Sequence, residues 1–187
     1  MKTLSIHING TLRDVLTKLK VVYQKYTNKD APEEIKDLDL LKYFDFKDEE
    51  ELLSFMYEEC PMEIFGHGRV LTENSFVKLN EFYKKYRDVF KIKLVSDEVE
   101  KSKPATLFFL AKYGCLIDTV EFYGLGKEKE MWENTDIFVS ADSIILDNKP
   151  EDKKTIKISN EYNENSEGDY IIDTINEDTN TIRNDEK

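Results

Sequence analysis

The stretch Ser5-Ile6-His7-Ile8-Asn9-Gly10-Thr11-Leu12-Arg13-Asp14, close to the N-terminus, carries the most information about the fold of this chain. Residues 3–8 alternate between apolar and polar side chains, which predicts a β-strand. A Gly-Thr turn follows, and from Leu12 to Tyr26 apolar residues recur at helical spacing. The sequence therefore predicts a strand, a tight turn and a helix, with His7 and Asn9 at the end of the strand.

The composition limits the classes of protein to consider. At 187 residues, with 40% hydrophobic and 12% aromatic residues, the chain fits one domain with a packed core. The formal net charge is -12, and the acidic residues concentrate in 29–60 and after 150. Because affinity for nucleic acid depends largely on Lys and Arg, this charge argues against a nucleic-acid partner.

The expected location follows from the cysteines and from the apolar runs. Cys60 and Cys115 are the only cysteines, which favours a reducing compartment over a disulfide framework. No apolar run approaches the roughly 18–20 residues of a membrane span, and the N-terminus enters a strand without a signal peptide. We expect a cytoplasmic protein with no membrane partner. The many Lys, Asn, Ile, Glu and Tyr residues suggest an AT-rich genome, so a viral particle assembled in a host cytoplasm is the other location considered.

The remaining chain alternates helices and strands. The acidic segment 28–59 predicts two or three short helices, and Pro61 and Gly66-His67-Gly68 are expected to break the chain. Further helices are predicted over 75–86, 104–113 and 127–134, and further strands over 90–95, 119–123, 136–140 and 155–159. This alternation predicts an α/β fold with a doubly wound parallel sheet.

The first loop resembles the opening motif of the haloacid-dehalogenase-like (HAD-like) phosphatases, D-x-D-G-T/V-L-x-D. His7 stands where that family has its nucleophilic aspartate, and Asn9 stands where it has its general acid/base. The family's phosphoryl transfer needs an anionic oxygen nucleophile, a second carboxylic acid and a bound Mg²⁺. The resemblance therefore implies the fold of these enzymes, and the two exchanges imply that their chemistry is lost.

Later segments resemble further motifs of the same family, in the same order. Ser96 ends a predicted strand, where the family has a phosphate-binding Ser or Thr. The family also has a motif lysine a few residues before an aromatic pattern that residues 108–114 resemble. The corresponding position here is Ala105 or Thr106, and the nearest lysine is Lys103. Segment 135–143 resembles the last motif: either Ala141 replaces the first acid and Asp142 matches the second, or both acids are replaced, by Ser140 and Ala141.

The resemblance is closest to the 5'(3')-deoxyribonucleotidase-like branch, which inserts a small helical cap after the first motif and whose closing Pro-Tyr-Asn is similar to Glu161-Tyr162-Asn163 here. It implies a HAD-like core over residues 1–27 and 61–163 and a small helical cap over 28–60. The Asn-, Glu- and Asp-rich residues 164–187 are expected to form an acidic, mobile C-terminal tail.

The candidate site is the set of degenerate motif positions, with no catalytic residue and no metal ligand assigned. They are His7, Asn9, Thr11, Asp14, Ser96, Lys103, Ala141 and Asp142. Thr11, Ser96 and Lys103 are the candidate phosphate-binding residues, and no cofactor is expected. For Asp14 a structural role is favoured over a catalytic one, because a polar side chain after such a turn often binds backbone amides.

These observations predict a catalytically inactive HAD-like protein that acts through a protein partner, as an interaction component or as a structural or accessory component, with a phage particle as one setting. The contact surface is expected on the acidic cap, with Tyr43, Phe44 and Phe55, and around an exposed Trp132. One alternative is a nucleotide- or phosphate-binding module. The other is a residual 5'-nucleotidase-type phosphatase that uses His7 as its nucleophile or relies on Asp142.

Overall fold

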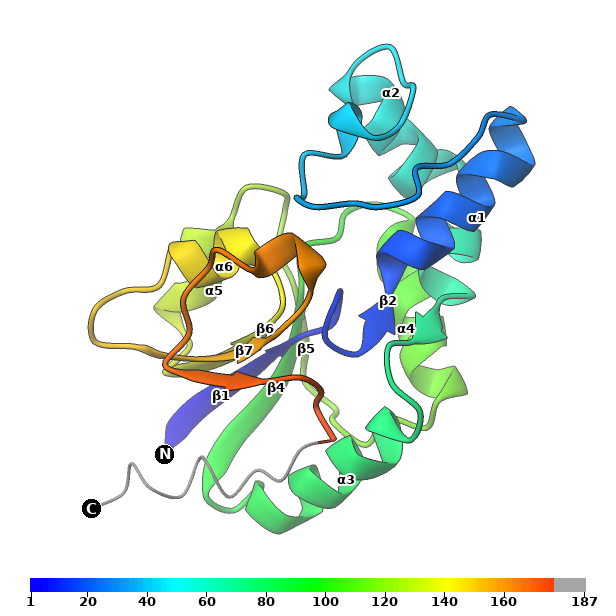
Figure 1. Cartoon of the computed structure of the whole chain (residues 1–187). Helices are drawn as coiled ribbons and strands as arrows, with labels where there is room; N and C mark the ends of the chain where they lie inside the picture. Colours follow the sequence, from blue (N-terminus) through cyan, green and yellow to red (C-terminus); the bar gives the residue numbers. More distant parts are fainter. Residues whose placement is uncertain (177–187) are drawn as a thin grey trace.

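The computed structural model describes residues 1–176 and shows a six-stranded parallel sheet (Figure 1). The strand order is β5-β4-β1-β6-β7-β8. The strands are β1 Lys2–His7, β4 Phe90–Ser96, β5 Val120–Phe122, β6 Ile137–Ser140, β7 Lys154–Ile158 and β8 Tyr170–Ile172. The doubly wound α/β fold predicted from the sequence is confirmed.

The first strand lies in the middle of the sheet, between β4 and β6. His7 pairs in register with Val95 of β4, and Ile6 pairs with Val139 of β6. The strand order reverses around β1, because the chain adds β4 and β5 on one side of it and β6, β7 and β8 on the other. In open α/β sheets, ligands usually bind beside such a reversal, in the crevice outside the carboxyl ends of the strands. The first loop opens at this point.

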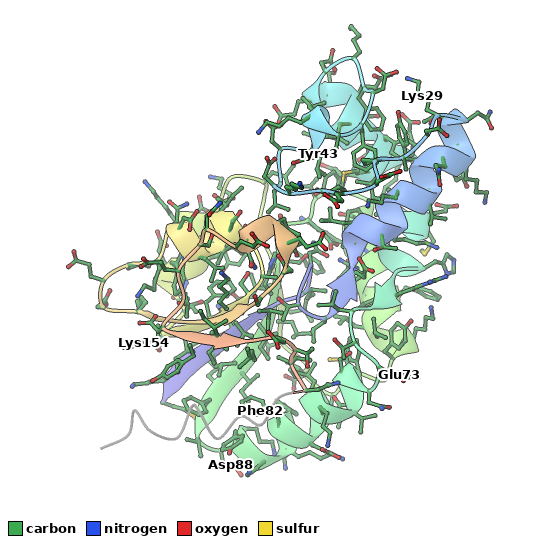
Figure 2. All side chains as sticks on the ribbon, in the orientation of Figure 1. Lys29, Tyr43, Glu73, Phe82, Asp88 and Lys154 are labelled. Carbon is green, nitrogen blue, oxygen red and sulfur yellow. The ribbon has the colours of Figure 1, made fainter. Side chains whose placement is uncertain are left out.

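Helices cover both faces of the sheet. On one face, α3 (Ser75–Tyr86) and α4 (Ser102–Lys112) pack against the strands in the largest apolar cluster, to which Phe82 of α3 adds its ring (Figure 2). On the other face, α5 (Glu128–Glu133) and α6 (Ser143–Asp147) pack against Val95 and Phe138. Successive side chains of a strand point to opposite faces of the sheet. Val139 therefore packs in the cluster with α3 and α4, and its neighbour Phe138 packs in the cluster with α5 and α6.

A helical cap stands over the carboxyl edge of the sheet (Figure 1). It contains α1 (Val15–Thr27), a 3₁₀ turn η1 (Leu40–Lys42), α2 (Glu49–Ser54) and two π-helical turns, η2 (Phe55–Glu59) and η3 (Met62–Gly66). Tyr23 joins the elements, because its ring packs edge-on against Phe44, Phe46 and Phe55 at centroid distances of 5.0, 5.3 and 6.4 Å. Helix α1 thus packs with the cap residues, although the sequence places residues 1–27 in the core.

Three further segments differ from their expectations. Pro61 does not break the chain but directly precedes η3 with helical backbone angles. A proline is tolerated at the beginning of a helix because its missing N–H would lack a partner there. A two-residue ladder joins β2 (Arg13–Asp14) to β3 (Arg69–Val70). Strand β8 pairs with β7 at Ile156↔Tyr170, so part of the expected tail from 164 onward belongs to the sheet; residues 177–187 of that tail lie outside the described residues.

No helix in the described part of the chain combines the length and the apolar character that crossing a membrane requires.

Candidate functional site

Three neighbouring strands, β1, β4 and β6, end at the same edge of the sheet, and polar side chains lie at each of these ends. His7, Ser96 and Ser140 are the last residues of β1, β4 and β6, and the residues that follow them are Asn9 after β1, Asp97 and Glu98 after β4, and Asp142 after β6. Because the strands are parallel, their carboxyl ends bring together segments that are far apart in the sequence.

His7 is held on both ring nitrogens. Its side chain is 1% exposed, its Nε2 lies 3.2 Å from Asp97 Oδ1, and its Nδ1 lies 3.4 Å from Ser140 Oγ. Asp142 completes the cluster, since one ligand atom each from His7, Asp97 and Asp142 lie within 4.8 Å of one another. We call these three residues the His-Asp-Asp cluster.

The charges of the His-Asp-Asp cluster depend on one another. Burial alone would lower the pKa of His7, but the hydrogen bond and charge of Asp97, with Asp142 and Glu98, outweigh it and raise that pKa. Burial would raise the pKa of Asp97, yet its bond to His7 lowers it. For Asp142, burial raises the pKa despite the attraction of His7. His7 and Asp97 thus favour the charged form of each other, whereas burial disfavours a charge on Asp142.

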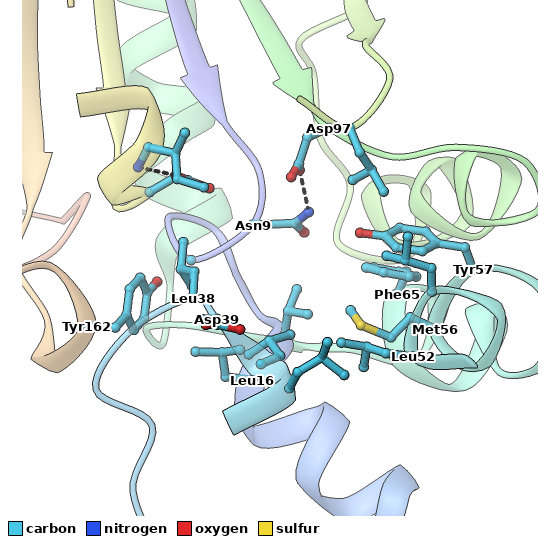
Figure 3. A pocket seen from close by; sticks show the side chains of 18 of the residues that line it. Asn9, Leu16, Leu38, Asp39, Leu52, Met56, Tyr57, Phe65, Asp97 and Tyr162 are labelled. Carbon is cyan, nitrogen blue, oxygen red and sulfur yellow. Dashed lines mark hydrogen bonds between the residues drawn. The ribbon is translucent and has the colours of Figure 1, made fainter. Parts of the chain in front are cut away.

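Asn9 is fixed at both ends of its amide. Its Nδ2 lies 3.2 Å from Asp97 Oδ1 and 3.3 Å from Glu98 Oε1, and its Oδ1 accepts from Arg13 Nη2 at 2.6 Å. Figure 3 shows the amide of Asn9 turned toward the carboxylate of Asp97. An amide in this position orients its neighbours, but it has no proton to exchange at neutral pH.

Arg13 forms the buried support of the loop. Its five N–H donors are all used: they reach Asn9 Oδ1 twice, Phe65 O, Thr106 Oγ1 at 2.7 Å and Glu98 Oε1. The side chains of Arg13 and Glu98 are both fully buried, and the guanidinium lies 5.0 Å from the ring centroids of Phe65 and Phe109. Burial lowers the pKa of Arg13, and the charge of Glu98 counters this. The pair ties the first loop to the segment after β4.

A cavity of about 530 Å³ lies between this sheet edge and the cap. Figure 3 shows Asn9 and Asp97 on one side of it and Leu16, Leu52 and Met56 on another. Tyr162 also lines the cavity, next to Gly10, where a larger residue would collide with the tyrosine hydroxyl. A cavity of this size, mostly apolar with a few convergent polar groups, is typical of a small-molecule site.

The structure places only some of the sequence-predicted residues at this cavity. Asn9, Asp14 and Asp142 line it, and Asp14 also caps α1 by accepting from the N–H of Thr17 at 3.1 Å, the structural role favoured for it. His7 lies behind the cavity, in the cluster with Asp97 and Asp142.

The candidate phosphate-binding residues do not line the cavity. Ser96 is buried and donates to Glu98 Oε1 at 3.0 Å, and Lys103 is exposed on α4. Thr11 is buried, with no hydrogen-bond partner for its Oγ1 among the described residues. Ala141 is buried, and its carbonyl accepts from Asn163 at 2.7 Å.

Burial corrects three residues of the expected contact surface, Trp132, Phe44 and Phe55, whereas Tyr43 is half-buried. Trp132 is 2% exposed, donates from Nε1 to the carbonyl of Ile145 at 3.0 Å and packs against Phe138, so it cannot be a surface contact. The cap aromatics Phe44 and Phe55 are likewise buried inside the cap. The charged neighbours of Trp132 in the sequence suggested that it is exposed, but one face of a short helix can be buried while the opposite face is charged and exposed.

Arg13, Asp97 and Glu98 belong to the site but were not predicted there from the sequence. A signal was present, because Asp97 and Glu98 directly follow Ser96 at the end of a strand predicted to enter the core. Acidic side chains at the carboxyl end of a central parallel strand commonly face the ligand crevice.

Comparisons with known proteins agree with this fold. No family model matches the chain, and no curated protein matches it. Among the solved structures similar to it, two are crystal structures of a dehalogenase, one of them in an intermediate complex. Their TM-scores are 0.53 and 0.51, each at 9% sequence identity, and the match covers 94% of both chains. This similarity shows a HAD-like fold.

Phosphatases with this fold imply a Mg²⁺ ion at the first loop, and the residues present do not fit it. Mg²⁺ requires an octahedral shell of hard oxygen ligands at about 2.0–2.1 Å. The first loop itself offers only an imidazole nitrogen from His7 and a neutral amide from Asn9, whose oxygen accepts from Arg13. The nearby carboxylates, those of Asp97 and Asp142, come from the ends of other strands and share the site with the imidazole. The first loop itself therefore lacks the two carboxylates on which phosphoryl transfer in the resembling family depends.

Proposed function

We propose that this protein is a HAD-like domain that has lost the hydrolytic chemistry of the family and acts by binding a small ligand in the cavity under its cap. The observation that carries the proposal is the state of His7 and Asn9, the residues at the nucleophile and acid/base positions. Both are held in hydrogen bonds to Asp97, and neither is free to act on a substrate.

The geometry of His7 argues against nucleophilic attack. A nucleophile needs an unshared electron pair directed at the substrate, whereas the two ring nitrogens of His7 face Asp97 and Ser140, and the side chain is buried. The same reasoning applies to carbon–halogen cleavage, the activity that the name dehalogenase implies for the two structural neighbours. We infer that this chain neither dephosphorylates nor dehalogenates through a covalent intermediate at position 7.

The charges around the cavity indicate which ligands it takes. No Lys, Arg or His is among the described residues that line it, whereas six acids do. The acids are Asp14, Asp39, Glu49, Asp97, Glu128 and Asp142. Apolar side chains, mainly leucines, form most of the remaining wall. This lining favours an apolar molecule with a positive or neutral polar end over a nucleotide or a phosphate, and it moves the proposed binding function from the surface to the cavity.

A matched series of ligands tests this preference. We expect hexylamine to raise the melting temperature, hexanol to raise it less and hexanoate to leave it unchanged, with a chelator present and at low ionic strength. The reason is that a ligand which binds only the folded state stabilises it more the tighter it binds, and the acids of the cavity repel the carboxylate of hexanoate. Differential scanning fluorimetry with the three compounds at equal concentration measures the effect.

The control removes charge without changing shape. The double variant Glu49→Gln and Glu128→Gln should reduce the shift with hexylamine and leave the shift with hexanol as it is. Equal stabilisation by hexanoate and hexylamine in the unmodified protein would contradict the proposed ligand class.

A further inference from the structure

The His-Asp-Asp cluster (His7, Asp97 and Asp142) brings one imidazole nitrogen and two carboxylates together from three different strands. Its three ligand atoms lie within 4.8 Å of one another, at the ends of β1, β4 and β6. With metal–ligand distances of about 2.0–2.2 Å, two ligands of a tetrahedral zinc ion stand roughly 3.3 Å apart. The 3.2 Å hydrogen bond between His7 Nε2 and Asp97 Oδ1 spans such an edge, so an ion bound between these two atoms would take the place of the shared proton.

The side chains of the cluster are oriented by neighbours that do not belong to it. Ser140 Oγ lies 3.4 Å from Nδ1 of His7, which leaves Nε2 directed at the cluster. Asp142 accepts from the N–H groups of Ile144 and Ile145 at 2.7 and 3.2 Å, in both cases through Oδ1. Its Oδ2 is therefore available for a cation. Outer partners that fix the ring of a ligating histidine in this way are a regular feature of metal sites.

The cluster also has an approach route and a place for a further ligand. Asp97 and Asp142 both line the cavity, whereas the ring of His7 is buried behind them. Three protein ligands with an open position toward a cavity are the arrangement of zinc sites that bind water or a ligand in the fourth place.

We propose that His7, Asp97 and Asp142 bind one divalent transition-metal ion of the zinc type at the floor of the cavity. The imidazole decides the class of ion, because nitrogen suits zinc, cobalt and nickel while Mg²⁺ prefers oxygen ligands alone. The dication would balance the two carboxylates. Besides Asp97 and Asp142, four other acids line the cavity, so the cavity would still disfavour anionic ligands with the ion bound.

Cobalt is the spectroscopic probe for this site, since it follows zinc in ligand preference. Titration of chelator-treated protein with Co²⁺ should give visible d–d absorption that saturates at about one equivalent, and Zn²⁺ should displace it while millimolar Mg²⁺ should not. Asp142→Asn keeps a residue that can cap α6 and should weaken Co²⁺ binding at least tenfold. Ser140→Ala removes the partner of Nδ1 and the acceptor of the Asp142 N–H, and it should weaken Co²⁺ binding about tenfold.

The matched control is His67→Ala, because His67 is the other histidine of the chain and is exposed. This variant should bind Co²⁺ as the unmodified protein does. The proposal would be overturned if the unmodified protein showed no saturable Co²⁺ binding. It would also be overturned if Asp142→Asn and His7→Ala, the latter shown to be folded by circular dichroism, bound Co²⁺ as tightly as the unmodified protein. The hexylamine series is measured with a chelator present. The proposal of the metal site and the proposal of the ligand class are therefore tested independently of each other.

Discussion

Replacing Glu98 with alanine is expected to destabilise the folded protein by about 3–5 kcal/mol, because it leaves the charge of Arg13 buried without a partner. Both side chains of this pair are fully buried, and the guanidinium has no route to water without opening the loop. Thr106 would lose an acceptor at the same time. Urea unfolding followed by circular dichroism, at matched pH and salt, gives the change in unfolding free energy.

Two controls separate the buried charge from a general effect of substitution. Glu81→Ala removes the partner of Lys78 on the exposed face of α3 and should cost less than about 1 kcal/mol. The double variant Arg13→Met and Glu98→Leu should lose less stability than Glu98→Ala alone, because no charge is then left unpaired. A loss below about 1 kcal/mol for Glu98→Ala would show that the pair is not buried as described.

Trp132→Ala is expected to cost about 3–5 kcal/mol of stability, the usual range for removing a large aromatic side chain from a core. The indole packs against Phe138 and satisfies the carbonyl of Ile145, so the substitution creates a cavity and leaves a buried acceptor unpaired. The same unfolding experiment measures the effect, and Trp132→Phe should recover part of it by refilling some of the volume.

An exposed apolar residue provides the comparison for Trp132. Val77→Ala on α3, where the side chain is 55% exposed, should change stability by no more than about 0.5 kcal/mol. If Trp132→Ala proved equally mild, the tryptophan would have to lie on the surface, where its charged sequence neighbours suggested it.

The sequence was sufficient to predict the fold because its signals are local and regular. Strand alternation, helical spacing and the first loop with its Gly-Thr turn located β1, β4, β6, α3 and α4 to within a few residues. The burial of Trp132 was missed because a six-residue helix, α5, is too short for its spacing to reveal which face packs on the sheet.

The site was predicted less completely than the fold, because its contacts join segments that lie far apart in the sequence. Arg13 and Glu98 are 85 positions apart, and nothing in the sequence shows that a buried arginine needs this particular acid. Asp97 likewise joins His7 only through the parallel pairing of β1 with β4. The cavity depends on how the cap packs over the sheet, which residue spacing does not specify.

The claim that this HAD-like domain binds but does not hydrolyse is tested most directly by measuring turnover. Purified protein is assayed for phosphate release from p-nitrophenyl phosphate and deoxynucleoside monophosphates, and for halide release from 2-haloacids, with Mg²⁺ present and His7→Ala as the matched control. We expect both proteins to give the background rate with every substrate, because His7 and Asn9 are held by Asp97 and supply neither a nucleophile nor a proton. Saturable release by the unmodified protein that is lost in a folded His7→Ala variant would contradict the account.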